Sequence, residues 1–477
     1  MDIPPQLQPL QQFRDALHLV LPQRADALLD LLDALSSNSS ARSPVELSLH
    51  PLFRRTYNSV YDAIQNFGPS RDAALTGVER QAFASQLLNL CLATLPPPQR
   101  QKIWLFGLDV TPAARPFART LADRTFVYQP NPVGSNKPVT IGHAYSVLAA
   151  LPEKETPTAP PWVVPLVVQR LDSAHTATQI GVAQTRRLLE HLPAAAQGAL
   201  CVEVADSAYS GPAFLSPLAD QPNLVIVSRA RNNRVFYRSA EATAPGVGHP
   251  TWYGAEMALG RPETWSRPDV VETTSWTTRS GQTFTVRLEG WYEMRMRGHR
   301  AQPMHDHPFT LVRVQILNAV GQPVSTRPLW LIVVGARRGE LCLVEVWAAY
   351  RQRYDLEHFF RFGKQRLLLT AYHTPVVQYE ENWWQINPLA YVQLWLIRDL
   401  VERWPHPWER YLPASSASPV SPATAQRRFA EIVRQIGTPA AAPKPRGNPL
   451  GRAKGVRPAP RPRQPVIRKG QAAPTPA

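Results

Sequence analysis

The stretch IWLFGLDV, residues 103–110, is almost continuously apolar and carries a single acid, Asp109. Two later stretches resemble it, LCVEVAD at residues 200–206 and NLVIVS at residues 223–228. Short apolar runs bounded by turn residues predict buried strands. A helical pattern from about Ala174 to His191 lies ahead of the last two, and strands alternating with helices predict a sheet covered on both faces. The sequence thus predicts an α/β core, with further strands in TFVYQP (125–130), AYSVLAAL (144–151) and WVVPLVV (162–168).

The regions around this core have different patterns. Leucines at helical spacing predict a helical domain over residues 1–98, and the first part of the core then spans residues 99–230. In LFRRTYNSVYDAI the side chains that a partner could reach are Arg54, Arg55 and Tyr57. DNA contact and an ordinary solvated helix face are equally compatible with that segment. We expect this domain to bind DNA, with the solvated face as the alternative.

The second half of the chain changes character twice. Alternating patterns over residues 231–340 predict an all-β insertion, so the chain is α+β overall. Helices return over residues 341–412, one from about Leu343 to Leu369 and one from about Pro388 to Arg403. Residues 413–477 form a Pro-rich basic tail that we predict to be mostly disordered.

Charge and composition narrow the function classes. The chain has 477 residues, 44% of them hydrophobic, and a formal charge of +16. A surplus of this size favours polyanionic partners, and nine of the sixteen charges lie between Lys444 and Lys469, a stretch without acids that suits phosphate backbones. A tail that only confers solubility is the alternative. Apolar runs stay below the roughly 18 residues of a membrane helix, no secretory signal is visible, and the three scattered cysteines fit no metal or disulfide pattern.

The strongest local motif lies in AAYRQRYDLEHFFRFGKQRL, residues 348–367. At about 100° per residue, Tyr350, Arg353, Glu357 and Lys364 fall at roughly 0°, 300°, 340° and 320° on a helix, which is one narrow stripe. An Arg–Glu pair at this spacing is often just a surface ion pair. The added tyrosine and lysine favour a functional face, with one metal-binding carboxylate flanked by phosphate-binding groups.

This spacing, Y-x2-R-x3-E-x6-K, resembles the signature of a large group of bacterial insertion-sequence transposases in the DDE superfamily. The resemblance implies an RNase H-like catalytic domain interrupted by the all-β insertion, with Glu357 as the third catalytic acid. The first acid of that fold ends its first strand, where we place Asp109, and the second ends its fourth strand, where we place Asp206. Glu357 follows Asp206 by 151 positions, and the insertion accounts for this long separation.

The resemblance also implies the chemistry. Asp109, Asp206 and Glu357 would bind two Mg²⁺ ions, for which Mn²⁺ is expected to substitute, because carboxylates are the oxygen ligands these cations prefer. The expected activity is cleavage at transposon ends followed by strand transfer into target DNA, by cut-and-paste transposition. The expected partners are double-stranded terminal inverted repeats and target DNA, bound by a homodimer in the bacterial cytoplasm at the nucleoid. A catalytically silent, domesticated DNA-binding copy and a nuclease that does not join strands are the alternatives.

Further candidate DNA contacts are basic or aromatic. By resemblance, Tyr350, Arg353 and Lys364 hold phosphates, and one tryptophan of the insertion stacks on a flipped base; the sequence does not choose among its candidates. Strand alternation in YEMRMRGHR predicts a basic face opposite an apolar face of Tyr292, Met294 and Met296. MHDH (304–307), SAYSG (207–211) and GVGHPTWYG (246–254) lack the partners of a metal, nucleophile or nucleotide site. The tryptophans are Trp252, Trp265, Trp276 and Trp291, and the basic residues are Arg295, Arg297 and His299 on that face and Arg229, Arg231 and Arg234 in SRARNNR.

Overall fold

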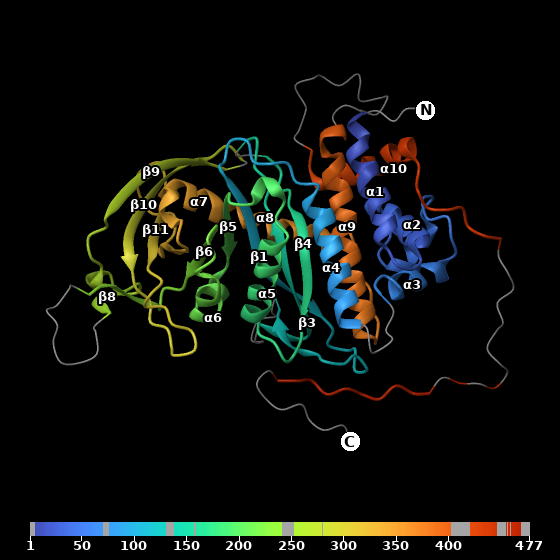
Figure 1. Cartoon of the computed structure of the whole chain (residues 1–477), viewed down its shortest axis with the longest axis horizontal. Coiled ribbons are helices and arrows are strands. Elements are labelled where there is room, and N and C mark those ends of the chain that lie inside the picture. Colours follow the sequence, from blue (N-terminus) through green and yellow to red (C-terminus); the bar gives the residue numbers. More distant parts are fainter. Residues whose placement is uncertain are drawn as a thin grey trace.

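The computed structural model describes residues 5–69, 76–129, 138–156, 159–240, 252–278, 280–401, 420–445, 455, 457 and 459–468. Its centre is a mixed sheet of ten strands (Figure 1). Five of them stand in the order β4-β3-β1-β5-β6, in which β4, β3 and β1 are antiparallel and β1, β5 and β6 are parallel. The bounds are β1 Ile103–Ala114, β3 Val139–Ala150, β4 Val164–Leu171, β5 Leu200–Ala205 and β6 Leu224–Ala230.

The β-rich segment continues this sheet. Strand β12 pairs antiparallel with β6, and β11, β10 and β9 follow in that order. A two-stranded sheet of β7 and β8 lies beside it, and β2 forms the opposite edge of the main sheet next to β3. The bounds are β2 Thr125–Tyr128, β7 Val235–Ser239, β8 Tyr253–Ala258, β9 Val270–Thr277, β10 Thr283–Met294, β11 Phe309–Leu317 and β12 Leu329–Val334.

Helices cover the faces of the sheet. Helix α5, Ala177–Glu190, begins at a capping box in which Thr176 and Gln179 exchange hydrogen bonds. It lies close to β1 because Gly181 has no side chain: a Cβ there would stand 2.8 Å from Leu108 Cδ2. Helix α6, Pro212–Leu215, follows β5, and α7, Leu343–Gln352, and α8, Tyr354–Arg366, follow β12.

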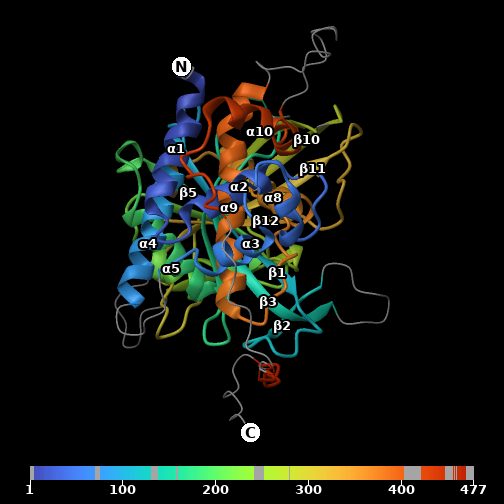
Figure 2. The same cartoon turned by 90° about the vertical axis from the view of Figure 1, so that its right-hand side faces the viewer.

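The remaining helices form a bundle at one side of the sheet (Figures 1 and 2). Its centre is α9, Val377–Val401, which contacts α2, α3, α10 and strand β4. The sequence predicted this helix to start at Pro388, but the helix runs through the proline, and the predicted start was wrong. Packing of a nearly all-buried helix outweighs the hydrogen bond that the proline lacks. The other bounds are α1 Gln8–Val20, α2 Ala25–Ser36, α3 Tyr57–Gln65, α4 Thr76–Leu92 and α10 Pro422–Ile436, and the short 3₁₀ helices are η1 Pro5–Leu7, η2 Pro44–Leu49, η3 Ala194–Ala196, η4 Ser207–Tyr209, η5 Ser216–Leu218, η6 Pro262–Thr264 and η7 Arg338–Glu340.

Helix α10 corrects the expectation that residues 413–477 are mostly disordered. It starts at the side-chain cap Ser421 and buries Phe429 and Ile432 against the bundle. Its apolar residues recur at helical spacing, which outweighs the Pro-rich composition around it. Residues 459–468 are also placed, whereas Arg446, Arg452, Lys454 and Lys469 of the predicted phosphate-binding tail lie outside the described residues.

Two polar networks hold the bundle, one within it and one between it and the sheet. Arg54 and Arg55 both pair with Asp30, and both donate to the carbonyl oxygen of Ala441. These two arginines therefore hold the chain after α10 in place. Tyr57, by contrast, is 56% exposed.

The second network joins the bundle to the sheet. Glu380 of α9 is fully buried and accepts hydrogen bonds from Arg115 and Tyr145, and it pairs with His143. Because Arg115 follows β1 directly and the other two residues lie on β3, this carboxylate fixes the far end of both strands.

Candidate active site

Asp109 lies in the middle of β1 and not at its end, which corrects the predicted position. Strand β5 stops pairing with β1 opposite Leu108, while β3 continues to pair as far as Ala114. The aspartate therefore stands where the parallel part of the sheet ends. Its Oδ1 accepts a hydrogen bond from the Val110 N–H (2.8 Å), and its side chain is 15% exposed.

Arg353 joins the first and third predicted acids. Its Nη1 donates to Asp109 Oδ2 at 2.8 Å, and its Nη2 donates to Glu357 Oε1 at 3.1 Å. The predicted single helix is in fact two, α7 and α8, which meet at Arg353. The arginine keeps helical dihedral angles, φ −50° and ψ −31°, so Glu357 stays on the face that looks at β1.

Asp206 follows β5 directly, as predicted. Its carboxylate caps the short helix η4 by accepting from the Ala208 N–H at 2.7 Å. The Asp206 and Glu357 charges both raise the pKa of Asp109, so the three acids lie within electrostatic reach of one another. Another acid of β5, Glu203, contacts Thr185 of α5 and lies away from this group.

The pKa of Asp109 is raised to about 6. Burial is the largest cause, because a charge loses hydration inside the protein. The Arg353 guanidinium lowers the pKa, and the neighbouring carboxylates raise it again. A carboxyl that needs a cation to remain ionised near neutral pH is typical of functional sites.

The other two members of the predicted stripe also face this site. Tyr350 is mostly buried, and the Arg353 guanidinium lies 5.7 Å from the centroid of its ring. Lys364 Nζ donates to Thr111 Oγ1 of β1 at 2.7 Å, and burial lowers the pKa of this lysine. All four stripe residues thus contact β1 or one another.

Basic residues line the neighbouring end of β6. Arg229 is exposed, and its charge lowers the pKa of Tyr350, which places it beside the stripe. Arg231 Nε donates weakly to Ser207 Oγ at 3.4 Å, next to Asp206. Arg234 donates to the Ser210 carbonyl oxygen and is partly buried, so it supports the loop and does not line an open surface.

The predicted basic face in YEMRMRGHR is only partly formed. Glu293 adopts a left-handed backbone, φ 52°, and the pairing of β10 with β11 shifts there. This bulge turns Tyr292 outward, 44% exposed, while Met294 and Met296 stay buried. The strict alternation that grouped the tyrosine with the methionines was therefore wrong.

The basic side chains of that segment have different surroundings. Arg295 is held by the His305 carbonyl oxygen, and His299 is exposed. Arg297 lies over the Tyr237 ring, 4.7 Å from its centroid, and over the Tyr253 ring at 5.6 Å. Arg297 is thus both exposed and packed on aromatic rings, which distinguishes it from Arg295 and His299.

The four candidate tryptophans separate by exposure. Trp291 is 1% exposed and donates to the Ser266 carbonyl oxygen, which makes it a core residue. Trp265 donates to the Ala258 carbonyl oxygen, and Trp276 packs on Phe284. Trp252 is 37% exposed and stacks on His305 at 3.8 Å.

The carboxylates of Asp109, Asp206 and Glu357 are suitable ligands for a hard divalent cation, but in this structure they do not converge on one point. Among the described residues, no three His, Cys, Asp or Glu side chains stand close enough to hold a metal ion. Instead, the Arg353 guanidinium supplies the positive charge between Asp109 and Glu357. In the MHDH segment, His305 pairs with its neighbour Asp306 and His307 with Asp220.

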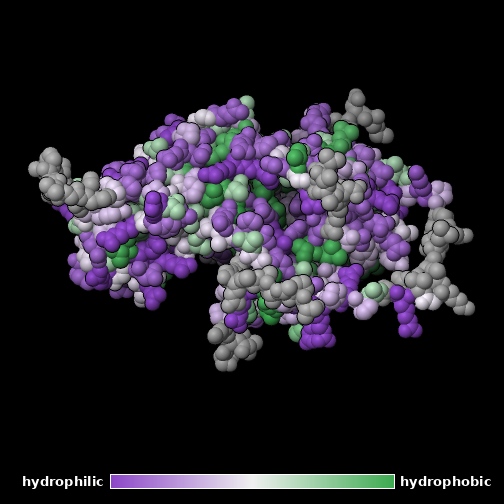
Figure 3. Space-filling model, turned by 60° about the horizontal axis from the view of Figure 1, so that its bottom comes forward, coloured by the Kyte–Doolittle hydropathy of each residue, from purple (hydrophilic) through white to green (hydrophobic). Residues whose placement is uncertain are grey.

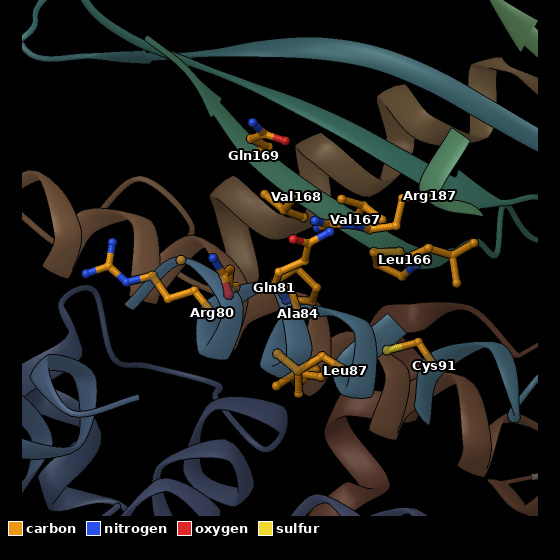
Figure 4. A pocket seen from close by; sticks show the side chains of 15 residues that line it. Arg80, Gln81, Ala84, Leu87, Cys91, Leu166, Val167, Val168, Gln169 and Arg187 are labelled. Carbon is orange, nitrogen blue, oxygen red and sulfur yellow. The ribbon is translucent and has the colours of Figure 1, made fainter. Parts of the chain in front are cut away.

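A pocket of about 420 Å³ lies elsewhere, between α4 and β4 (Figure 4). The Gln81 side chain on α4 points toward Val167 on the strand, and Leu87 and Leu166 also line the pocket. The three acids are not among the residues that line it. In the described part of the chain, no helix is long and apolar enough to cross a membrane.

The strand order β4-β3-β1-β5-β6, with acids on β1 and after β5, is that of an RNase H-like nuclease fold. The chain belongs to the DDE superfamily endonuclease family, which matches residues 16–289, more than half of its length. Membership indicates a nuclease or transposase type of activity on DNA, in a family whose members typically use divalent metals. The match includes Asp109 and Asp206 and ends before the Tyr350–Lys364 stripe. Among curated proteins, none matches the chain.

Proposed function

We propose that this protein is a DNA transposase that cleaves transposon ends and joins them to target DNA by a cut-and-paste route. The observation that carries the proposal is the Arg353 bridge between Asp109 and Glu357, with Asp206 in electrostatic reach. Family membership supports a DNA substrate. The complete stripe of Tyr350, Arg353, Glu357 and Lys364, which faces β1, favours a transposase over a nuclease that only cuts.

In this proposal the three acids hold two Mg²⁺ ions, or Mn²⁺ in their place. The ions supply positive charge that stabilises the attacking and leaving oxygens of phosphoryl transfer. Protonation of Asp109 would limit metal binding at low pH, because the pKa of this acid lies near 6. Arg353 has to leave the carboxylates for a cation to be held there, and a DNA phosphate is the natural new partner for its guanidinium.

The remaining residues of the site would position DNA. Lys364 and Tyr350 hold phosphates near the cleaved bond, and Arg229 and Arg231 extend that contact past η4. Hydrolysis frees a 3′ hydroxyl at the transposon end. This hydroxyl then loses its proton and attacks a target phosphodiester, and the bond from that phosphorus to the target's own 3′ oxygen breaks, so that this oxygen leaves as a new 3′ hydroxyl. We propose terminal inverted repeats as the bound sequence and a homodimer as the DNA complex.

Base stacking in the β-rich segment is the next element of the proposal. Among the four candidate tryptophans, Trp252 has the most exposed ring. The Tyr253 ring lies next to it and adds a second aromatic surface, and the Arg297 guanidinium lies over that tyrosine ring. We therefore place base stacking, if a hairpin pathway is used, at Trp252. Arg295, which is tied to a carbonyl oxygen, would support this surface from below.

The test uses the DNA that borders the gene, labelled at its ends and supplied with MgCl₂ and a target plasmid. Asp109→Asn, Asp206→Asn and Glu357→Gln should each abolish cleavage while duplex binding survives. Glu203→Gln is the matched control, because this acid of β5 faces α5 and burial raises its pKa to about 8, so it is already neutral at pH 7. Full cleavage by any of the three variants would overturn the proposed triad.

The same assay separates the alternatives. A domesticated copy binds the labelled ends without cutting them. A nuclease that does not join strands releases the ends without forming products on the plasmid. Joined products that disappear in all three variants support the transposase.

A further inference from the structure

Residues 459–468 dock beside the sheet through specific hydrogen bonds. They run in extended form (Figure 1) and contact the segment between β1 and β2. The Gln464 N–H donates to the Arg119 carbonyl oxygen and the Ile467 N–H donates to the Arg124 carbonyl oxygen, both at 2.8 Å. Pro462 and Pro465 hold this segment extended before it docks, which lowers the entropy cost of ordering it.

The receiving surface is built around a buried arginine. Arg124 is 3% exposed, and its guanidinium donates to the carbonyl oxygens of Leu121 and Arg115. Its Nη2 also donates to the Gln464 carbonyl oxygen at 3.2 Å. The docked segment therefore supplies an acceptor to a buried cation of the fold, in addition to the two backbone hydrogen bonds.

Docking leaves the positive charges of the segment on the outside. Arg461, Arg463 and Arg468 are exposed, as is Arg119 beside them. Among the described residues, none of these four forms an ion pair with a carboxylate. The Arg468 guanidinium lies 5.9 Å from the centroid of the half-exposed Phe126 ring. Seen from this underside, the molecule is mainly hydrophilic with scattered apolar patches (Figure 3).

The docked strip, defined as residues 459–468 together with Arg119, lies on the continuation of the strand that carries the candidate active site. Asp109 and Arg115 are six residues apart, roughly 20 Å of extended strand. A nucleic-acid strand advances about 3.4 Å per phosphate, so this length corresponds to roughly six nucleotides. A duplex held at Asp109 and running along β1 toward Arg115 would therefore approach the segment onto which the strip docks.

We propose that the docked strip is a DNA-backbone contact surface, and that its docking onto residues 115–124 is what makes it effective. The inference rests on the proposed function for its partner. A segment already held in place contacts phosphates without the ordering cost that a free tail has when it binds. Because phosphate contacts release counterions, the strip should be visible in the salt dependence of binding.

The test measures binding of the full-length protein to a 30-base-pair duplex across a range of NaCl concentrations, by fluorescence anisotropy. The triple variant Arg461→Gln, Arg463→Gln, Arg468→Gln should weaken binding at least tenfold at about 0.15 M salt and lower the slope of log K against log salt by about 2 to 3. Ile467→Pro removes one docking N–H and no charge, and it should weaken binding severalfold. Faster tryptic cleavage at the tail would show that this variant has undocked.

A matched control neutralises three charges earlier in the tail, by Arg446→Gln, Arg452→Gln and Lys454→Gln. A smaller effect from this control than from the strip variant supports the proposal. Equal losses in both triples, with wild-type binding by an undocked Ile467→Pro protein, overturn it, because the tail then acts as an unstructured polycation. Wild-type binding by the strip triple also overturns it.

The outcome for the proposed function is separate. If the strip variants bind DNA as well as the wild type does, and the wild type binds and cuts the duplex, only the proposed role of the strip is refuted. Failure of the wild type to bind any duplex refutes the proposed function itself.

Discussion

Replacing Asp109 with asparagine should stabilise the folded protein near neutral pH. Its pKa is about 6 in the fold against an ordinary 3.8. The folded state therefore binds the proton more tightly than the unfolded chain does. For an acid with a raised pKa, stability is highest below the unfolded value and is lost as pH rises through the folded one. At pH 7.5 the ionised carboxylate is thus a destabilising group.

The size follows from the shift. A difference of about two pKa units at about 1.4 kcal/mol each gives about 3 kcal/mol at pH 7.5. The same two values give about 1 kcal/mol at pH 4.5 and almost nothing at pH 3.5. Solvent screening takes little from this figure, because the side chain is only 15% exposed. Asparagine has the shape of the protonated acid and keeps most of its contacts.

Urea denaturation of the wild type and Asp109→Asn at the three pH values measures this directly, in buffer with EDTA so that no cation occupies the site. The variant's advantage should fall steadily as the pH drops. Glu203→Gln at pH 7 serves as a control, since that acid is already neutral there and the substitution changes no charge. An unchanged or lower free energy of unfolding for Asp109→Asn at pH 7.5 would refute the conclusion that the ionised Asp109 carboxylate destabilises the fold.

Three further predictions concern other contacts. Arg353→Gln should tighten Mn²⁺ binding to the DNA-free protein about tenfold by calorimetry, because it removes a cation that charge-assisted hydrogen bonds hold between the carboxylates; unchanged affinity would show that the arginine does not compete. Gly142→Ala should cost about 1–3 kcal/mol in thermal unfolding, because its Cβ would stand 2.2 Å from a strand carbonyl oxygen, whereas Gly77→Ala, with open space around it, should cost nothing. Glu380→Gln should cost about 3–5 kcal/mol, because it leaves the buried Arg115 without its counter-ion; a smaller loss on urea denaturation would mean that water or the histidine compensates.

Much of the fold could be predicted from local patterns. Continuous apolar runs predicted the core strands, and helical spacing predicted the stripe from Tyr350 to Lys364. The core strands formed as predicted because burial on one or both faces leaves a periodic trace in neighbouring residues. The stripe residues lie on two helices that meet at Arg353, and not on the single helix that was predicted. Local patterns were less reliable where one residue with an unusual backbone conformation shifts the inward–outward alternation of side chains along a strand. The left-handed Glu293 reversed the expected face of Tyr292, and no residue type at that position signals such a bulge.

Other features depended on tertiary packing alone. Asp109 and Arg353 are 244 residues apart, and only the packing of α8 against β1 brings the guanidinium to the carboxylate. The pairing of β12 with β6 could not be predicted either, because strand edges pair through backbone groups that every sequence provides. The return of residues 459–468 is a third case, since a Pro-rich basic segment has no periodicity from which docking can be predicted. The sequence by itself thus determined which side chains could carry the chemistry, and tertiary structure decided which of them meet.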